Sequence, residues 1–142
     1  TNDAASAVTR LVDMGVEPFL LASTLRGVLA QRLVRKLCPA CRTPEATTAA
    51  DRELLGDSAP AQLWHATGCP ECSRTGYAGR SGIYELIVVD DAFQRLIHTG
   101  ADEAALRAHA LAHGTRSLRD DGLRLLAGGL TSAEELLRVT RE

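Results

Sequence analysis

Aromatic residues are scarce in this sequence, at 4% of 142 residues, although hydrophobic residues as a whole make up 45%. Aliphatic side chains, mainly Leu, Val and Ala, must therefore fill the core, which disfavours an all-β sandwich. A chain of this length and hydrophobic content forms one ordinary domain or two small lobes. The expected fold class is α+β, rich in helix.

A strong net charge is also lacking, because 16 basic and 18 acidic residues leave a formal charge of −2. We therefore expect no nucleic-acid partner. No apolar run approaches the roughly eighteen residues of a membrane span, and the first residues lack the basic and apolar parts of a signal peptide. We expect an intracellular chain without a membrane span. Because the chain opens without Met, we also expect it to be a piece of a longer protein.

Complete catalytic motifs are missing as well. The sequence contains no P-loop of the form Gly-x-x-x-x-Gly-Lys-Ser/Thr, so the chain alone is not expected to hydrolyse ATP. His109 and His113 have the spacing of metalloprotease zinc ligands, but Ala110 stands where the general base would be, which favours ordinary exposed helix histidines. Asp120 and Asp121 fall in the first turn of a predicted helix, where negative charge is favourable, and are interpreted as structural.

Hydrophobic periodicity predicts a helix-rich chain with one strand pair that brackets the cysteines. A capping box, Thr131-Ser132-Ala133-Glu134, predicts the start of a last helix. The C-terminal third is expected to form a small helical bundle. The predicted helices cover 4–14, 19–29, 51–55, 91–98, 102–113, 118–127 and the segment from 131, and the predicted short antiparallel strands cover 33–37 and 83–89.

The four cysteines form two Cys-Pro-X-Cys segments, 38–41 and 69–72. Two residues between thiolates let one tight turn aim both sulfurs at a single tetrahedral ion, so two such turns complete a closed site. We therefore predict one structural zinc ion without an open position for catalysis. The intervening residues are interpreted as an excursion outside the core, and closing a loop of this length costs little. The predicted zinc ligands are Cys38, Cys41, Cys69 and Cys72.

Other interpretations of these residues stay open. Two disulfides would need an oxidising compartment, and a thioredoxin-like redox pair would need a preceding βαβ unit. The segment 69–76 resembles the Cys-x-x-Cys-x-Gly knuckles of chaperone-type zinc domains, which would make the chain a free-standing module that binds polypeptide or nucleic acid. Arg32, Arg35 and Lys36 form the densest basic patch, either as a solvated strand edge or as a contact for an acidic partner or a phosphate.

The order of the motifs closely resembles the C-terminal region of the type II secretion system ATPases, the GspE-like tetracysteine zinc-binding subtype. It resembles the type IV pilus assembly ATPases slightly less closely. The resemblance covers essentially the whole chain. It is carried by Thr1-Asn2-Asp3, by the two cysteine turns and by the segments 15–23, 29–35, 76–86, 118–123 and 131–135.

The resemblance implies that the intact protein is a cytoplasmic, hexameric P-loop ATPase that powers pseudopilus assembly for protein secretion. Its implied partners are the rest of the ATPase, neighbouring subunits and inner-membrane platform proteins, and its implied cofactors are Zn²⁺ and, in the intact parent only, ATP with Mg²⁺. The implied parts are the end of a RecA-like ATPase domain (1–37), a zinc-binding subdomain (38–84) and a C-terminal helical subdomain (85–142). Thr1-Asn2-Asp3 would end the family's His box, and Gln31 and Arg32 would lie near a neighbouring subunit or the nucleotide.

Overall fold

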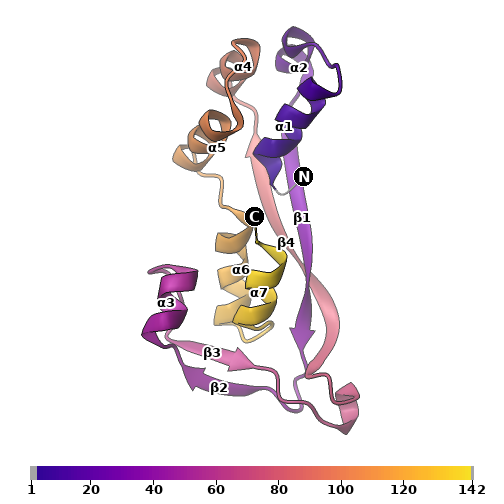
Figure 1. The fold of residues 1–142 in the computed structure, drawn as a ribbon, viewed down its shortest axis with the longest axis vertical. Helices are drawn as coiled ribbons and strands as arrows, with labels where there is room; N and C mark the ends of the chain where they lie inside the picture. Colours follow the sequence, from indigo (N-terminus) through magenta and orange to yellow (C-terminus); the bar gives the residue numbers. More distant parts are fainter. Residues whose placement is uncertain (1–2, 142) are drawn as a thin grey trace. The chain divides into compact units, whose positions relative to one another are not determined.

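The computed structural model describes residues 3–141, which form the α+β fold expected from the composition (Figure 1). Thr1 and Asn2, assigned above to the end of a His box, lie outside the described residues. None of the described helices is long and apolar enough to cross a membrane. The elements are α1 (Ala4–Asp13), α2 (Pro18–Thr24), β1 (Gly27–Leu37), β2 (Thr43–Ala46), α3 (Ala49–Leu55), β3 (Gln62–His65), the 3₁₀ helix η1 (Pro70–Cys72), β4 (Tyr77–Val88), α4 (Asp91–His98), α5 (Glu103–Ala112), α6 (Leu118–Ala127) and α7 (Ala133–Val139).

The chain divides into two compact units, each built from two separate segments. The first contains residues up to 30 together with 84–117, and the second contains 31–83 together with the residues from 118 onward. The helices after β4 accordingly form two pairs, with α4 and α5 in the first unit and α6 and α7 in the second. The functional division into 1–37, 38–84 and 85–142 stays a prediction.

Helix α1 begins where the sequence predicts. Asp3 caps it, because its carboxylate accepts the Ser6 N–H at 2.9 Å while the Ser6 hydroxyl lies 3.2 Å from the Asp3 N–H. The predicted continuation of the second helix to residue 29 is wrong, because α2 ends at Thr24 and the backbone of Leu25 is already extended. Two apolar side chains of α2, Phe19 and Leu20, are exposed by 62% and 51%.

The predicted pairing of the two long strands is confirmed, and both strands are longer than expected. Backbone hydrogen bonds also join the residues that flank the two strands, from Val89 to Arg26 at 3.1 Å and from Cys38 to Gly76 at 2.9 Å. The start of β1 thus lies beside the end of β4, so the two strands are antiparallel. In β4 the residues alternate between buried and exposed from position 83 onward, as expected for a strand with one covered face.

The core of the first unit is aliphatic apart from one ring. Helices α1, α2, α4 and α5 contribute to it, and Ile87 reaches it from β4. Each Å² of apolar surface removed from water stabilises the fold by about 25 cal/mol, and this burial holds the short helices together. The buried members are Ala4, Ala5, Val8, Leu21, Ala22, Ile87, Phe93, Ile97, Leu106 and Ala110.

The segment between the two cysteine turns is more than an excursion, contrary to the expectation from the sequence. It contains the antiparallel pair of β2 and β3, in which Pro44 lies opposite Trp64. Leu63 of β3 is 1% exposed, and β3 contacts both α6 and α7. Arg42 lies 4.3 Å from the centre of the Trp64 ring and donates a hydrogen bond to the Gly129 carbonyl at 2.5 Å. This segment therefore belongs to the core of the second unit.

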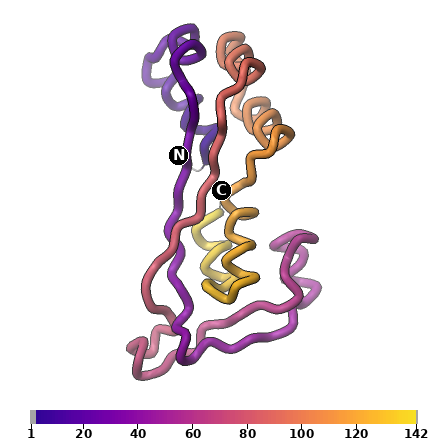
Figure 2. Tube along the Cα trace, turned by 180° about the vertical axis from the view of Figure 1, so that it is seen from behind, coloured from indigo at the N-terminus to yellow at the C-terminus, as the bar shows by residue number. Residues whose placement is uncertain are grey.

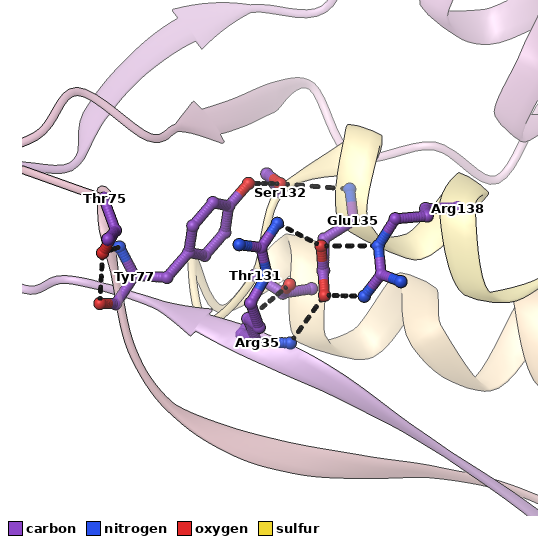
Figure 3. Close-up of polar contacts among 7 residues, drawn as sticks. All are labelled: Arg35, Thr75, Tyr77, Thr131, Ser132, Glu135 and Arg138. Atoms are coloured by element: carbon purple, nitrogen blue, oxygen red, sulfur yellow. Dashed lines mark hydrogen bonds and ion pairs between the residues drawn. The ribbon is translucent and has the colours of Figure 1, made fainter.

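Helix α7 begins one residue later than the predicted capping box. Its N-cap is Ser132, whose hydroxyl accepts the Glu135 N–H at 3.2 Å (Figure 3). Thr131 instead donates its hydroxyl to the Arg35 carbonyl of β1 at 2.7 Å. The Ser132 hydroxyl thus caps α7, whereas the Thr131 hydroxyl binds β1. Tyr77 of β4 makes a further hydrogen bond of 2.7 Å to the Ser132 hydroxyl. These contacts fasten α7 to both long strands within the second unit.

Candidate metal centre

The two cysteine pairs meet where β1 ends and β4 begins, and the trace in Figure 2 shows these two strand ends side by side. Cys38 directly follows β1, and its N–H donates to the Gly76 carbonyl at 2.9 Å just before β4. The two long strands therefore bring the two turns together across about thirty residues of intervening chain, as the sequence predicts. In the first turn, Arg42 donates its N–H to the Cys38 carbonyl at 3.1 Å.

The second turn is held in a less common backbone conformation. Cys69 and Cys72 flank Pro70 and Glu71, and the Arg74 N–H closes the turn by donating to the Cys69 carbonyl at 2.8 Å. Ser73 and Arg74 follow with φ angles of 55° and 62°. Non-glycine residues in this region cost on the order of 1 kcal/mol each and persist only where the surroundings fix them. The hydrogen bonds from Arg74 and Thr75 to the carbonyls of Cys69 and Cys72 help to hold this conformation.

The four sulfurs are arranged as the corners of a small polyhedron. The Sγ atoms of Cys38 and Cys69 are 3.8 Å apart, those of Cys41 and Cys72 are 3.9 Å apart, and those of Cys69 and Cys72 are 3.8 Å apart. Zinc–sulfur bonds of about 2.3 Å in a tetrahedron place the sulfurs roughly 3.8 Å from one another. The cluster therefore has the dimensions of a four-thiolate site and could hold one metal ion.

Backbone N–H groups point at the sulfurs from the loops beside the turns. Gly68 donates to the Sγ of Cys41 at 3.3 Å, and Gly76 donates to the Sγ of Cys72 at 3.2 Å. Both glycines have positive φ angles, and an added Cβ at Gly76 would come within 2.6 Å of the Ala66 Cβ. Donors of this kind favour the thiolate over the thiol.

The pKa values of the cysteine thiols also favour the binding of a cation. Burial raises the pKa of the Cys72 thiol, but the N–H groups of Cys69 and Gly76 outweigh burial and lower its pKa to about 6. Burial and the neighbouring sulfurs raise the pKa of Cys41 to about 11. One thiol thus ionises readily while another resists ionisation beside it. A bound cation would remove this conflict, because metal-bound thiols are deprotonated.

All four cysteines are free in the structure. A disulfide would bring two sulfurs to about 2.05 Å, far closer than the 3.8 Å separation of Cys69 and Cys72. The arrangement therefore fits a shared ion better than two covalent bridges.

The basic patch of β1 does not act as one unit. Arg35 extends toward Glu135 of α7, with its guanidinium 3.0 Å from the carboxylate, so its acidic partner lies within the chain. Gln31 is exposed on β1, and the Arg32 guanidinium lies 3.5 Å from the Gln31 carbonyl. The role of Gln31 and Arg32 near a subunit or a nucleotide stays a prediction.

A second group of polar side chains was missed by the sequence argument. His109 is only 15% exposed at its side chain and lies 3.2 Å from Asp90, which contradicts its interpretation as an exposed helix histidine. The rings of His109 and His113 stack with their centres 4.0 Å apart. The histidine spacing on α5 was visible in the sequence, but the approach of Asp90 from a different helix was not. Asp120 and Asp121 do lie in the first turn of α6.

Comparison with known proteins places the chain in one family. The family described as Type II/IV secretion system protein matches residues 1–138. The type II secretion system protein HxcR of Pseudomonas aeruginosa is 57% identical over all of this chain, and the type II secretion system ATPase E of Vibrio cholerae is 54% identical. The type IV pilus assembly ATPase TfpB of Acinetobacter baylyi is 45% identical over 98% of the chain.

The match covers only part of each relative. The chain spans 27% of the length of HxcR, 28% of the Vibrio ATPase and 24% of TfpB. The resemblance seen in the cysteine turns and the flanking segments is nevertheless confirmed along nearly the whole chain. The chain belongs to the Type II/IV secretion system protein family.

Proposed function

We propose that this chain is the C-terminal part of a cytoplasmic, hexameric ATPase that powers type II secretion, and that Cys38, Cys41, Cys69 and Cys72 hold one structural zinc ion. The observation that carries the zinc assignment is that three sulfur separations are 3.8 to 3.9 Å, close to the edge of a zinc–thiolate tetrahedron, while all four sulfurs lie within 4.8 Å of one another. The ion would serve structure alone, because four thiolates fill its coordination.

The zinc-bearing turns would hold the two long strands in a fixed position relative to each other. They join the end of β1 to the start of β4, and β1 and β4 in turn carry Arg35 and Tyr77, which contact α7. A structural zinc ion is worth on the order of 10 kcal/mol in small metal-binding folds, which exceeds the strain at Ser73 and Arg74 by a wide margin. The strands would thereby form a stiff connection that transmits motion generated upstream.

ATP hydrolysis is assigned to the rest of the protein. The sequence of this chain contains no P-loop, so ATP and Mg²⁺ would bind upstream, with Gln31 and Arg32 near a neighbouring subunit or the nucleotide. Inner-membrane platform proteins are the proposed docking partners. A type II role is supported by the identity to HxcR and the Vibrio ATPase, at 57% and 54%, whereas TfpB and the type II secretion system protein E of Klebsiella pneumoniae are both 45% identical to the chain.

The zinc assignment is tested by metal analysis of protein purified without oxygen or added metal. We expect close to one zinc per chain, and we expect Cys72→Ser to reduce both the zinc content and the melting temperature. Ser6→Ala, which removes a hydroxyl far from the cysteines in sequence and in the other unit, is the control for the metal content. Less than a few tenths of a metal equivalent, with a melting temperature that chelators leave unchanged, would refute the assignment.

The motor assignment needs a longer protein that includes this chain and its upstream sequence. We expect ATPase activity in the longer protein and none in the 142-residue chain. Substituting the cysteines in the longer protein should reduce secretion. ATP hydrolysis by the isolated chain, or secretion that is indifferent to all four cysteines, would contradict the proposal.

A further inference from the structure

Three side chains of the first unit converge at a place separate from the four cysteines. Asp90 precedes α4, whereas His109 and His113 lie at the end of α5, and one ligand atom from each lies within 4.8 Å of the others. The two oxygens of Asp90 are 3.2 and 3.3 Å from Nε2 of His109. Such a set contains two imidazoles and one carboxylate, which are common ligands of divalent transition metals.

The hydrogen bond of His113 leaves its Nε2 available as a ligand. Its Nδ1 lies 2.8 Å from the carbonyl oxygen of His109, one helical turn earlier. A carbonyl oxygen only accepts hydrogen bonds, so Nδ1 carries the proton and the lone pair of the neutral ring is on Nε2. Metal-bound histidines are oriented in this way, with the other ring nitrogen donating to a backbone carbonyl or a carboxylate.

Asp90 is held in place and kept ionised by its neighbours. Its Oδ1 accepts the Phe93 N–H at 2.7 Å as the N-cap of α4. This hydrogen bond has the largest effect and lowers the pKa of Asp90, burial opposes it, and His109 and His113 lower the pKa further. The ring of His109 packs 6.0 Å from the ring of Phe93, centre to centre, which limits its rotation. Two of the three groups are therefore preorganised.

An ordinary His109–Asp90 ion pair accounts for only part of this arrangement. That pair does not include the ring of His113, which stacks on His109 with 4.0 Å between the ring centres and has its ligand atom within 4.8 Å of Asp90. A shared cation would give both rings a ligand role, and it would replace the proton between His109 and Asp90. The ligands of a tetrahedral zinc site lie about 3.3 Å apart, close to the present separation of His109 and Asp90. His113 is exposed at the helix end and can supply the remaining movement.

We propose that Asp90, His109 and His113 bind one divalent transition-metal ion, such as Zn²⁺, with positions left open for water. This site goes beyond the proposed motor function and is independent of the four cysteines. The alanine at position 110 removes the general base of a metalloprotease but no metal ligand, so it does not prevent binding.

Calorimetric titration of Zn²⁺ into the chain tests the proposal, after metal analysis has shown that one zinc per chain is already bound. We expect a second equivalent to bind. His113→Ala should weaken it at least about tenfold, and so should Asp90→Asn, which removes the charge but keeps an oxygen to cap α4. His98→Ala is the matched control, because His98 lies on α4 in the same unit and faces Phe19.

Nitrogen-15 NMR of the histidine rings gives a second, independent measurement. The Nε2 resonances of His109 and His113 should shift with the second equivalent of Zn²⁺, whereas those of His98 should stay in place. Absence of a second equivalent, or one whose affinity is unchanged in both His113→Ala and Asp90→Asn, would overturn the proposal. Circular dichroism of each variant confirms that the comparison is made between folded proteins.

Discussion

Glu135 of α7 binds both the backbone and the side chain of Arg35, although the two residues are 100 positions apart in the sequence. Its Oε1 accepts the Arg35 N–H at 3.0 Å, and its Oε2 accepts the guanidinium at 3.0 Å (Figure 3). Arg138 contacts the same carboxylate at 2.6 Å, and the Glu135 side chain is 1% exposed. The carboxylate therefore occupies a buried position with every oxygen paired.

Replacing Glu135 should destabilise the second unit. Glu135→Ala leaves the Arg35 N–H without its acceptor and removes the partner of two guanidinium groups. Because both guanidinium groups are about half exposed and can be hydrated, we expect a loss of roughly 2 to 3 kcal/mol in the free energy of unfolding. Urea denaturation of the parent chain and the variant measures this loss. Glu134→Ala, at a neighbouring side chain that is 68% exposed, should change stability by less than about 0.5 kcal/mol.

The same carboxylate makes stability depend on pH in the acid range. Burial raises the pKa of Glu135, but hydrogen bonds from Arg138 and Arg35 outweigh it and lower the pKa from 4.5 to about 2. The unfolded chain therefore binds the extra proton first as the pH falls. The contribution of Glu135 is complete above about pH 4.5 and is lost as the pH decreases toward 2.

Glu135→Gln measures this contribution by difference. The stability gap between the parent chain and Glu135→Gln should be larger at pH 6 than at pH 3, as determined by urea unfolding at both values. Any loss of metal in acid affects both proteins and largely cancels in the difference. A gap of the same size at both pH values would show that the carboxylate has an ordinary pKa in the folded chain.

The glycines beside the cysteines offer a test of the geometry of the turns. Gly76→Ala and Gly79→Ala both place alanine at a positive φ angle, which costs about 1 to 2 kcal/mol in each case. At Gly76 the new Cβ also meets Ala66 at 2.6 Å, whereas at Gly79 it makes only an ordinary 3.8 Å contact with Lys36. We expect Gly76→Ala to cost more stability and to weaken zinc retention against a chelator. Equal effects of the two substitutions would count against a tight approach at Ala66.

The features that were predictable from the sequence are those specified by neighbouring residues. Cys-Pro-X-Cys spacing defines each pair of sulfurs, and Asp3, placed just before an apolar periodic segment, locates the start of α1. The β2 strand was missed because Thr43-Pro44-Glu45-Ala46 is short and fully exposed, and its pairing with β3 depends on contacts with α6 and α7. Its proline also argues against a strand when the sequence is considered alone.

Contacts between distant residues could not be derived from local patterns. Nothing near Arg35 in the sequence indicates that Glu135 neutralises it, so a solvated edge was a reasonable interpretation. In the same way, Asp90 and His109 are 19 positions apart and meet only because α4 and α5 pack together. Sequence reasoning therefore found the histidine pair but not the carboxylate that turns the pair into a candidate ligand set.

Gly122 of α6 lies against Leu136 of α7, and its replacement should reveal how tightly the two helices pack. Alanine is a better helix former than glycine by about 1 kcal/mol, so Gly122→Ala would stabilise an exposed helix. Here the added Cβ would collide with the end of the Leu136 side chain, which is 0% exposed.

We expect the collision to outweigh the propensity gain, because overpacking a filled core costs about 1 to 3 kcal/mol. Thermal unfolding of Gly122→Ala should therefore show a lower melting temperature than the parent chain. Gly128→Ala provides the control, because the nearest neighbours of its new Cβ lie at 3.6 Å or beyond and its φ angle is not in the left-handed region. A melting temperature raised by Gly122→Ala would mean that Leu136 can move aside and that the two helices are less tightly packed than their contact indicates.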